Sequence, residues 1–350
     1  MLSSIMLQFL LSTYLLPPDS IQAAYLSNRA TAPVLPNFES LVVFGDSYSD
    51  NCNLWRLVDA TPEQLEEYPI PTCPPAPLGR SDDGSVWAEF LATGTGLELL
   101  DFAVASATCS NTYFPSEATN SSGTTITLPD VGTQISQWQA YSASNESFNS
   151  ETTLAFVFIG TNDLGRLIFA PGTAATLINE VLCVSDSITQ LYQAGVRNMI
   201  VMNNAPLASL PIYAANSTFN STTLNPIYGD LPSFNGSTVY ERMVGLVDAN
   251  IAMQQVMLQA LITTLPDATL RVFDTYSYIN GLIADPIPVF GPDANTTGFC
   301  ACSDAACDYC TDPERYLWQN TVHPTQAFHQ ALAATMAEFI GLGYTNPLAT

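Results

Sequence analysis

The sequence contains no lysine and only two histidines. Its 350 residues hold eight arginines against 32 acidic side chains, which gives a formal net charge of -24 at pH 7. Such an excess of negative charge repels phosphate backbones and anionic lipid head groups, so it excludes nucleic-acid binding and electrostatic docking to membranes. We therefore expect the partner to be a neutral small molecule or oligosaccharide.

The sequence also lacks an apolar run long enough to cross a membrane. The apolar residues 5–16 are too few to span a bilayer, and Pro17-Pro18 and the small residues Ala23-Ala24 follow them. This layout is typical of a secretory signal peptide. We predict that residues 1–24 are removed near Ala24 and that the mature protein is secreted and extracellular. A first buried helix is the alternative, although the two prolines would end it early.

Glycosylation sequons and cysteines fit an exported protein. The eight cysteines are an even number, which predicts disulfides in an oxidising compartment. Four of them lie in residues 300–310, where a zinc knot is possible but a disulfide-stapled loop is favoured. Six Asn-x-Ser/Thr sequons predict a glycoprotein, at Asn120, Asn145, Asn216, Asn220, Asn235 and Asn295.

Short apolar runs alternate with helix-length segments along the chain. The runs are residues 41–44, 97–103, 154–159, 198–203 and 270–273, and the helical segments are residues 86–92, 131–142, 174–194, 240–265 and 325–340. Because parallel strands need crossover connections, this alternation predicts a three-layer α/β/α sandwich around a parallel sheet of about five strands. We expect one domain over residues 40–345, with a glycosylated surface excursion at residues 205–236.

Ser47 follows the first predicted strand, at the sheet edge where ligands of open parallel sheets bind. The start of the next helix favours negative charge, which suits attack on an ester carbonyl, but a serine there can equally be a helix cap. A serine nucleophile needs a general base, and His323 lies in a loop before the last predicted helix. His329 lies inside that helix and is interpreted as a packed or solvated residue.

Three sequence blocks resemble the SGNH, or GDSL, hydrolase superfamily. They are residues 44–50 (FGDSYSD), 160–163 (GTND) and 321–325 (TVHPT), in the family's order. Gly79-Arg80, followed by Gly84, Trp87, Glu89 and Leu91, also resembles the fungal acetylesterase branch, carbohydrate esterase family 16. The resemblance extends from about Leu41 to the final helix.

The resemblance implies a flavodoxin-like serine esterase that needs no cofactor and no metal. Ser47 would attack the acyl carbon while His323 takes its proton. The oxyanion hole would consist of the Asn162 amide and the backbone N–H groups of Ser47 and Ser106. Asn320 would be the third member that orients His323, with Asp312 or Glu314 as alternatives.

Several positions depart from the family pattern. Ser106 replaces the oxyanion glycine, where a positive φ strains a serine and its side chain crowds bulky acyl groups. Asn320 replaces an aspartate and cannot balance an imidazolium charge. Asp101 replaces an asparagine, and Cys52 replaces a glycine, with Cys73 as the nearest disulfide candidate.

The leading hypothesis is a monomeric secreted esterase that removes small acyl groups, acetyl above all, from carbohydrates. One alternative is a lipid-ester hydrolase of the lysophospholipase kind, which would use the same residues. Another is a weakly active or inactive homologue that binds glycan, and the departures at Asn320, Ser106 and Asp101 favour it.

Overall fold

The main sheet of the molecule has six strands, in the order β1-β8-β7-β6-β2-β3. The computed structural model describes residues 25–27, 37–59, 73–144, 149, 151–169, 175–215, 236–300 and 310–348. Five strands are parallel: β2 (Ser40–Gly45), β3 (Glu98–Asp101), β6 (Thr153–Phe158), β7 (Asn198–Met202) and β8 (Thr269–Phe273). The strand β1 (Tyr25–Ser27) pairs antiparallel with β8. The predicted parallel sheet of about five strands is therefore confirmed.

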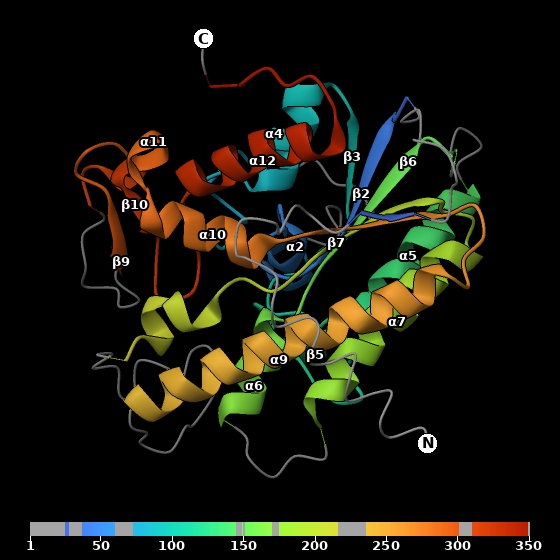
Figure 1. Ribbon diagram of the computed structural model, residues 1–350, viewed down its shortest axis with the longest axis horizontal. Helices are drawn as coiled ribbons and strands as arrows, with labels where there is room; N and C mark the ends of the chain where they lie inside the picture. The colour runs from blue at the N-terminus through green and yellow to red at the C-terminus, as the bar shows by residue number, and fades with distance from the viewer. Residues whose placement is uncertain are drawn as a thin grey trace, which may run out of the picture.

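Helices cover both faces of this sheet (Figure 1). One layer contains α4 (Trp87–Thr95), α10 (Thr275–Ala284) and α12 (Gln326–Ile340), and the other contains α5 (Val131–Ser144), α7 (Leu177–Gln193) and α9 (Gly236–Ile262). Shorter helices are α2 (Asn53–Asp59), α6 (Thr161–Phe169) and α11 (Ile287–Phe290). Two small sheets pair β4 (Glu117–Thr119) with β5 (Thr125–Thr127) and β9 (Asn295–Phe299) with β10 (Tyr316–Trp318).

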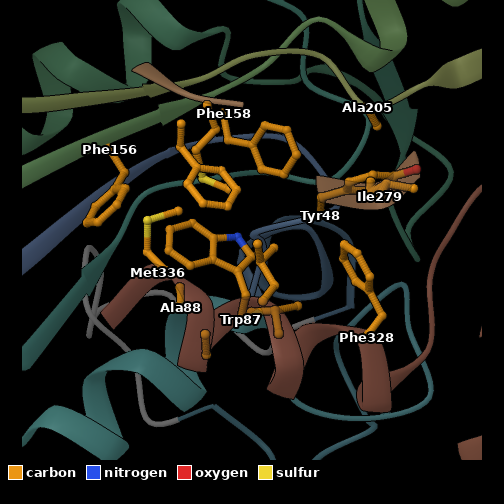
Figure 2. Packing of buried hydrophobic residues seen from close by; sticks show 14 of the residues in the cluster. Tyr48, Trp87, Ala88, Phe156, Phe158, Ala205, Ile279, Phe328 and Met336 are labelled. Atoms are coloured by element: carbon orange, nitrogen blue, oxygen red, sulfur yellow. The ribbon is translucent and has the colours of Figure 1, made fainter. Parts of the chain in front are cut away.

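Alternate residues of each central strand enter different hydrophobic cores, as the pleat of a strand requires. Leu41 and Val43 pack in the core beneath α4 and α12, whereas Val42 and Phe44 pack in the core beneath α5 and α7. Figure 2 shows the first core, where the Trp87 indole lies among side chains of the sheet and of α12. The two buried faces establish the predicted three-layer sandwich.

The predicted surface excursion at residues 205–236 differs from the structure in its first part. Residues 205–213 form the 3-10 turns η3 (Leu207–Ser209) and η4 (Pro211–Tyr213), in which Leu207, Leu210 and Ile212 are fully buried. These apolar side chains pack into the core beneath α4 and α12, and Pro206 and Pro211 stand at the starts of the two turns without directing the chain into solvent. Residues 216–235 lie outside the described residues.

Three disulfides lie among the described residues. The expected bond between Cys52 and Cys73 is present, and further disulfides join Cys109 to Cys183 and Cys300 to Cys310. Cys302 and Cys307, the predicted signal peptide and the sequons at Asn145, Asn216, Asn220 and Asn235 lie outside the described residues. No helix in the described part of the chain has both the length and the apolar character needed to cross a bilayer.

Candidate active site

Ser47 lies in a tight turn at the carboxyl end of β2. The side chain of Gln134 bonds both the N–H and the C=O of Gly45 at 2.9 Å, which fixes the end of the strand. Asp46 then accepts the N–H of Tyr48 at 3.1 Å and closes the turn. Ser47 is consequently held at the edge of the sheet with only 6% of its surface exposed.

His323 comes from the loop between β10 and α12. Asn320 Oδ1 accepts the backbone N–H groups of Val322 and His323, at 2.9 and 2.8 Å, and so shapes this loop. The Tyr48 hydroxyl donates to the Val322 carbonyl at 2.6 Å and ties the loop to the turn that carries Ser47. The result is a distance of 2.8 Å between His323 Nε2 and Ser47 Oγ.

The third residue of this chain of hydrogen bonds is Asn320, whose Oδ1 lies 3.1 Å from His323 Nδ1. An amide oxygen only accepts, so the His323 proton sits on Nδ1 and Nε2 is left to accept the Ser47 hydroxyl. Of the two alternative acids, Asp312 pairs with Arg315 at 3.4 Å and Glu314 is exposed. Of the three candidates, Asn320 is the one that contacts the imidazole.

Burial lowers the pKa of His323, while the negative charge of Asp82 raises it and His329 lowers it further. The net shift is downward, which favours the neutral imidazole. A neutral imidazole is the form that can accept a proton from serine.

Ser106 occupies the third position of a turn in which the Ala107 N–H bonds the Val104 carbonyl at 3.0 Å. Its φ of 66° is the left-handed value that a type II turn requires there and that glycine adopts most easily. The expected positive φ at this serine is thus present. Within the described residues, neither the Ser106 N–H nor the Ser47 N–H donates a hydrogen bond, so both are available to a substrate.

Asn162 lies at the start of α6, beside this turn. Its Nδ2 donates to the Ala107 carbonyl at 2.8 Å. Because an amide nitrogen carries two protons, one fixes the side chain and the other can donate to a further acceptor. The structure thus brings Asn162 next to the turn that carries Ser106.

Several groups that hold the Ser106 turn were missed by the sequence analysis. Asp50 accepts the Ala105 N–H at 2.6 Å, and Ser116 donates to the Ser106 carbonyl at 2.6 Å. Arg166 on α6 in turn donates to the Ser116 hydroxyl at 3.1 Å. The contacts of Asp50 and Arg166 join residues 55 and 50 positions apart, so no local sequence signal marks them.

Buried carboxyl groups surround the site. Burial raises the pKa of Asp46 and of Asp163 to about 7, and that of Asp50 to about 6. Burial, together with the nearby Asp50 charge, also raises the pKa of Asp101, which bonds the Ala103 N–H at 2.9 Å. Asp163 bonds the Cys109 N–H at 3.0 Å, so these groups build the loops around Ser47.

The second histidine, His329, is packed inside the protein. Of the two interpretations of this residue, packed or solvated, the first is confirmed. It is fully buried on α12, and its Nδ1 accepts the Trp87 N–H at 3.2 Å. Its Nε2 lies 3.3 Å from Asp82 Oδ2. His329 therefore connects α12 to α4 and does not contact Ser47.

A serine bonded to a histidine at the carboxyl edge of a parallel sheet is an arrangement of serine hydrolases. The family model of the GDSL-like Lipase/Acylhydrolase matches residues 41–336. The chain therefore belongs to this family of carboxylic-ester hydrolases.

Two relatives illustrate the similarity. An acetylesterase of Hypocrea jecorina is 25% identical over 312 residues, which cover 85% of this chain and 87% of the relative. A GDSL esterase/lipase of Arabidopsis thaliana is 26% identical over 338 residues, covering 84% and 82%. A solved acetyl xylan esterase variant from Geobacillus stearothermophilus is similar with a TM-score of 0.39 and 12% identity, covering 88% of this chain and 99% of that chain.

Proposed function

We propose that this chain is a secreted esterase that removes small acyl groups, acetyl above all, from carbohydrates. The observation that carries the proposal is the 2.8 Å contact between Ser47 Oγ and His323 Nε2. Membership of an esterase family and similarity to an acetylesterase support it. The disulfides among the described residues support an extracellular location.

In the proposed reaction, Ser47 Oγ attacks the acyl carbon and His323 Nε2 takes the hydroxyl proton. The negative charge on the carbonyl oxygen is stabilised by the N–H groups of Ser47 and Ser106 and by the Asn162 amide. His323 returns the proton to the leaving alcohol. Water then attacks the acyl-enzyme with His323 again as base, and the carboxylic acid and free serine are restored.

The preference for a small acyl group follows from Ser106. Its side chain is exposed at the turn, where glycine would leave open space. An acetyl group is small enough to fit beside a serine, whereas a long acyl chain has to displace it. The acidic surface favours a neutral carbohydrate as substrate, because it repels an anionic lipid.

The proposal is tested with the purified protein, acetylated xylo-oligosaccharides and a panel of aryl esters of increasing acyl length. We expect acetate release, faster turnover of acetyl than of octanoyl esters, and no activity above background for Ser47→Ala. The exposed Ser144 on α5 provides the matched control, and Ser144→Ala keeps the wild-type rate. Equal rates for wild type and Ser47→Ala contradict the proposal.

A second candidate function, glycan binding without catalysis, is favoured by Asn320 at the position of the family aspartate. In that case acetylated oligosaccharide binds but is not hydrolysed. Calorimetric titration of the oligosaccharide separates this function from hydrolysis. A preference for long-chain esters in the same panel would indicate a lipid-ester hydrolase.

A further inference from the structure

Helix α7 contacts both segments that form the proposed oxyanion hole. It packs along α9 and also contacts α6, the helix that carries Asn162 (Figure 1). Cys183 of α7 forms a disulfide with Cys109, which lies three residues after Ser106. Glu180 precedes Cys183 by three positions, so the two side chains lie on the same side of the helix. A single helix is thus placed to hold α6 and the turn that carries Ser106.

Glu180 is the centre of a group of buried polar side chains. Gln254 of α9 donates to its Oε1 at 3.0 Å, and Asn250 of the same helix donates to its Oε2. The Asn250 Oδ1 atom in turn accepts a hydrogen bond from Asn204 Nδ2 at 2.7 Å. All four side chains are buried. Glu180 therefore joins α7 to α9 and, through Asn250, to the loop that follows β7.

Glu180 and Asn204 lie against Gly160, the residue directly before α6. A Cβ atom at Gly160 would lie 2.5 Å from Asn204 Oδ1 and 3.0 Å from Glu180 Oε1, so these oxygens fit only against a glycine. The φ of Gly160, 122°, also lies in the region that favours glycine. Its carbonyl accepts the Leu164 N–H at 2.9 Å and so opens the first turn of α6. The position of Gly160 thus sets the start of α6, and with it the place of Asn162 two residues later.

The turn on the other side of the proposed hole is tied to the same helix. Its next residues lead to Cys109, which the disulfide fixes to Cys183. Asp163 accepts the Cys109 N–H at 3.0 Å, and the neighbouring Asn162 donates to the Ala107 carbonyl at 2.8 Å. The start of α6 and the turn are therefore held together where both contact α7.

The proposed reaction needs the Asn162 amide at one place relative to the acyl oxygen. Stabilisation of an oxyanion depends on donors that are already in position, and a displacement of about 1 Å can cost about 10²-fold in rate. We propose that Glu180 is a positioning residue that sets the place of the Asn162 amide through its contact with Gly160. This inference rests on the proposed esterase function.

The direct test observes the Asn162 amide itself, by NMR of the ¹⁵N-labelled protein. Asn162→Ala identifies the two Nδ2 proton signals by their loss. We expect Glu180→Ala to shift these signals and to speed their exchange with water, because the bond to the Ala107 carbonyl loosens. Unchanged Asn162 signals in Glu180→Ala overturn the proposal.

The matched control for this test is Ile188→Ala. Ile188 is buried about two turns further along α7, in the core beneath α5 and α7. Its loss leaves a cavity and lowers the thermal unfolding midpoint, but we expect the Asn162 signals to stay in place. A similar shift in Ile188→Ala and Glu180→Ala means that any weakening of α7 moves Asn162, and it overturns the specific role of Glu180. The spectra need no turnover, so they give an answer even if no ester is hydrolysed.

Kinetics on an aryl acetate provide the second test. We expect Glu180→Ala to lower kcat about 10- to 10²-fold with KM nearly constant. In the Asn162→Ala background the same change lowers kcat less than about threefold, because the group that Glu180 positions is gone. Equal losses in the two backgrounds show a general structural role and overturn the proposal.

The conservative variant Glu180→Gln should retain most of the rate. It keeps the shape of the side chain and one accepting oxygen. Within the described residues Gln254 Oε1 has no hydrogen-bond partner, so it can accept from the new amide. A loss as large as that of Glu180→Ala contradicts an effect that acts through the shape and contacts of this side chain.

Asn204→Ala gives an answer that does not depend on the folding of Glu180→Ala. It removes the oxygen nearest to the Gly160 Cβ position, and we expect a several-fold lower kcat in wild type and a smaller effect with Asn162→Ala. An unchanged kcat in Asn204→Ala overturns the proposal. Wild-type activity no higher than that of Ser47→Ala instead overturns the esterase function itself, and the NMR comparison then decides whether Glu180 positions Asn162.

Discussion

The turn at Ser106, which we propose as part of the oxyanion hole, and the histidine loop at Asn320 both carry a residue that departs from the family pattern. In the turn, the required group is a backbone N–H, which any residue except proline has, and the cost of serine is the left-handed φ of 66°. In the loop, the required group includes a charge, which asparagine lacks. Replacement of glycine therefore affects conformation, whereas replacement of aspartate affects electrostatics.

The largest expected effect follows from replacing His323. His323→Gln removes the base, and we expect kcat/KM for an aryl acetate to fall by about 10⁴-fold or more. Far-UV circular dichroism and thermal unfolding check that the variant is folded. A loss below about tenfold indicates another base and contradicts the arrangement.

The matching change on the oxyanion side is Asn162→Ala. It removes one donor to the oxyanion and the bond to the Ala107 carbonyl, so we expect kcat to fall about 10²- to 10³-fold with little change in KM. Initial rates over a range of ester concentrations separate the two constants. An effect on KM alone means that Asn162 binds the ground state and does not stabilise the oxyanion.

A smaller effect, an increase in kcat, is expected for a substitution of Ser106. Glycine adopts the left-handed conformation without strain, so Ser106→Gly increases kcat several-fold and increases it most for butanoyl and longer esters. Ser106→Ala keeps the strain and is the matched control, with no gain for acetyl esters. If Ser106→Ala equals Ser106→Gly, the hydroxyl and not the backbone conformation limits the rate.

The pH dependence of stability reports on the buried carboxyl groups around the active site and on Glu180, which lies near Asp163. Burial raises the pKa of Asp46 and Asp163 to about 7, of Asp50 to about 6, and of Glu180, on α7, to about 8. The folded chain then binds more protons than the unfolded chain between about pH 4 and 8, so its stability falls as pH rises through this range.

The measurement is the thermal unfolding midpoint, which we expect to decrease by about 5 °C or more from pH 4.5 to pH 8. Glu180→Gln removes one of these groups and makes the decrease shallower. A midpoint that rises over the same interval contradicts the buried, protonated state of these carboxyl groups.

The sequence predicts the frame of the fold well because buried parallel strands are apolar throughout. All five parallel strands and five helices lie where the runs and periodicities put them. The helices α6 and α10 were missed. Helix α6 starts three positions and α10 two positions after the end of a strand, and the cap of α10 is Asp274, whose side chain accepts the Ser277 N–H at 3.1 Å, so no polar linker separates strand from helix.

The candidate site is predictable only in part, because several of its contacts join residues far apart in the sequence. Ser47 and His323 stand in recognisable blocks, and the structure puts them in contact. Asp50 and Asp82 contact partners 55 and 247 positions away, Ala105 and His329. Such pairs depend on tertiary packing and leave no periodic or local signal.

The central claim is that Ser47 is the nucleophile activated by His323, and covalent labelling tests it most directly. A fluorophosphonate probe should add to one serine, in the tryptic peptide 30–56, which lies between Arg29 and Arg56 and contains Ser47. We expect the adduct in wild type, none in Ser47→Ala, and a much slower reaction in His323→Gln. Labelling at another serine, or equal labelling of wild type and Ser47→Ala, would contradict the account.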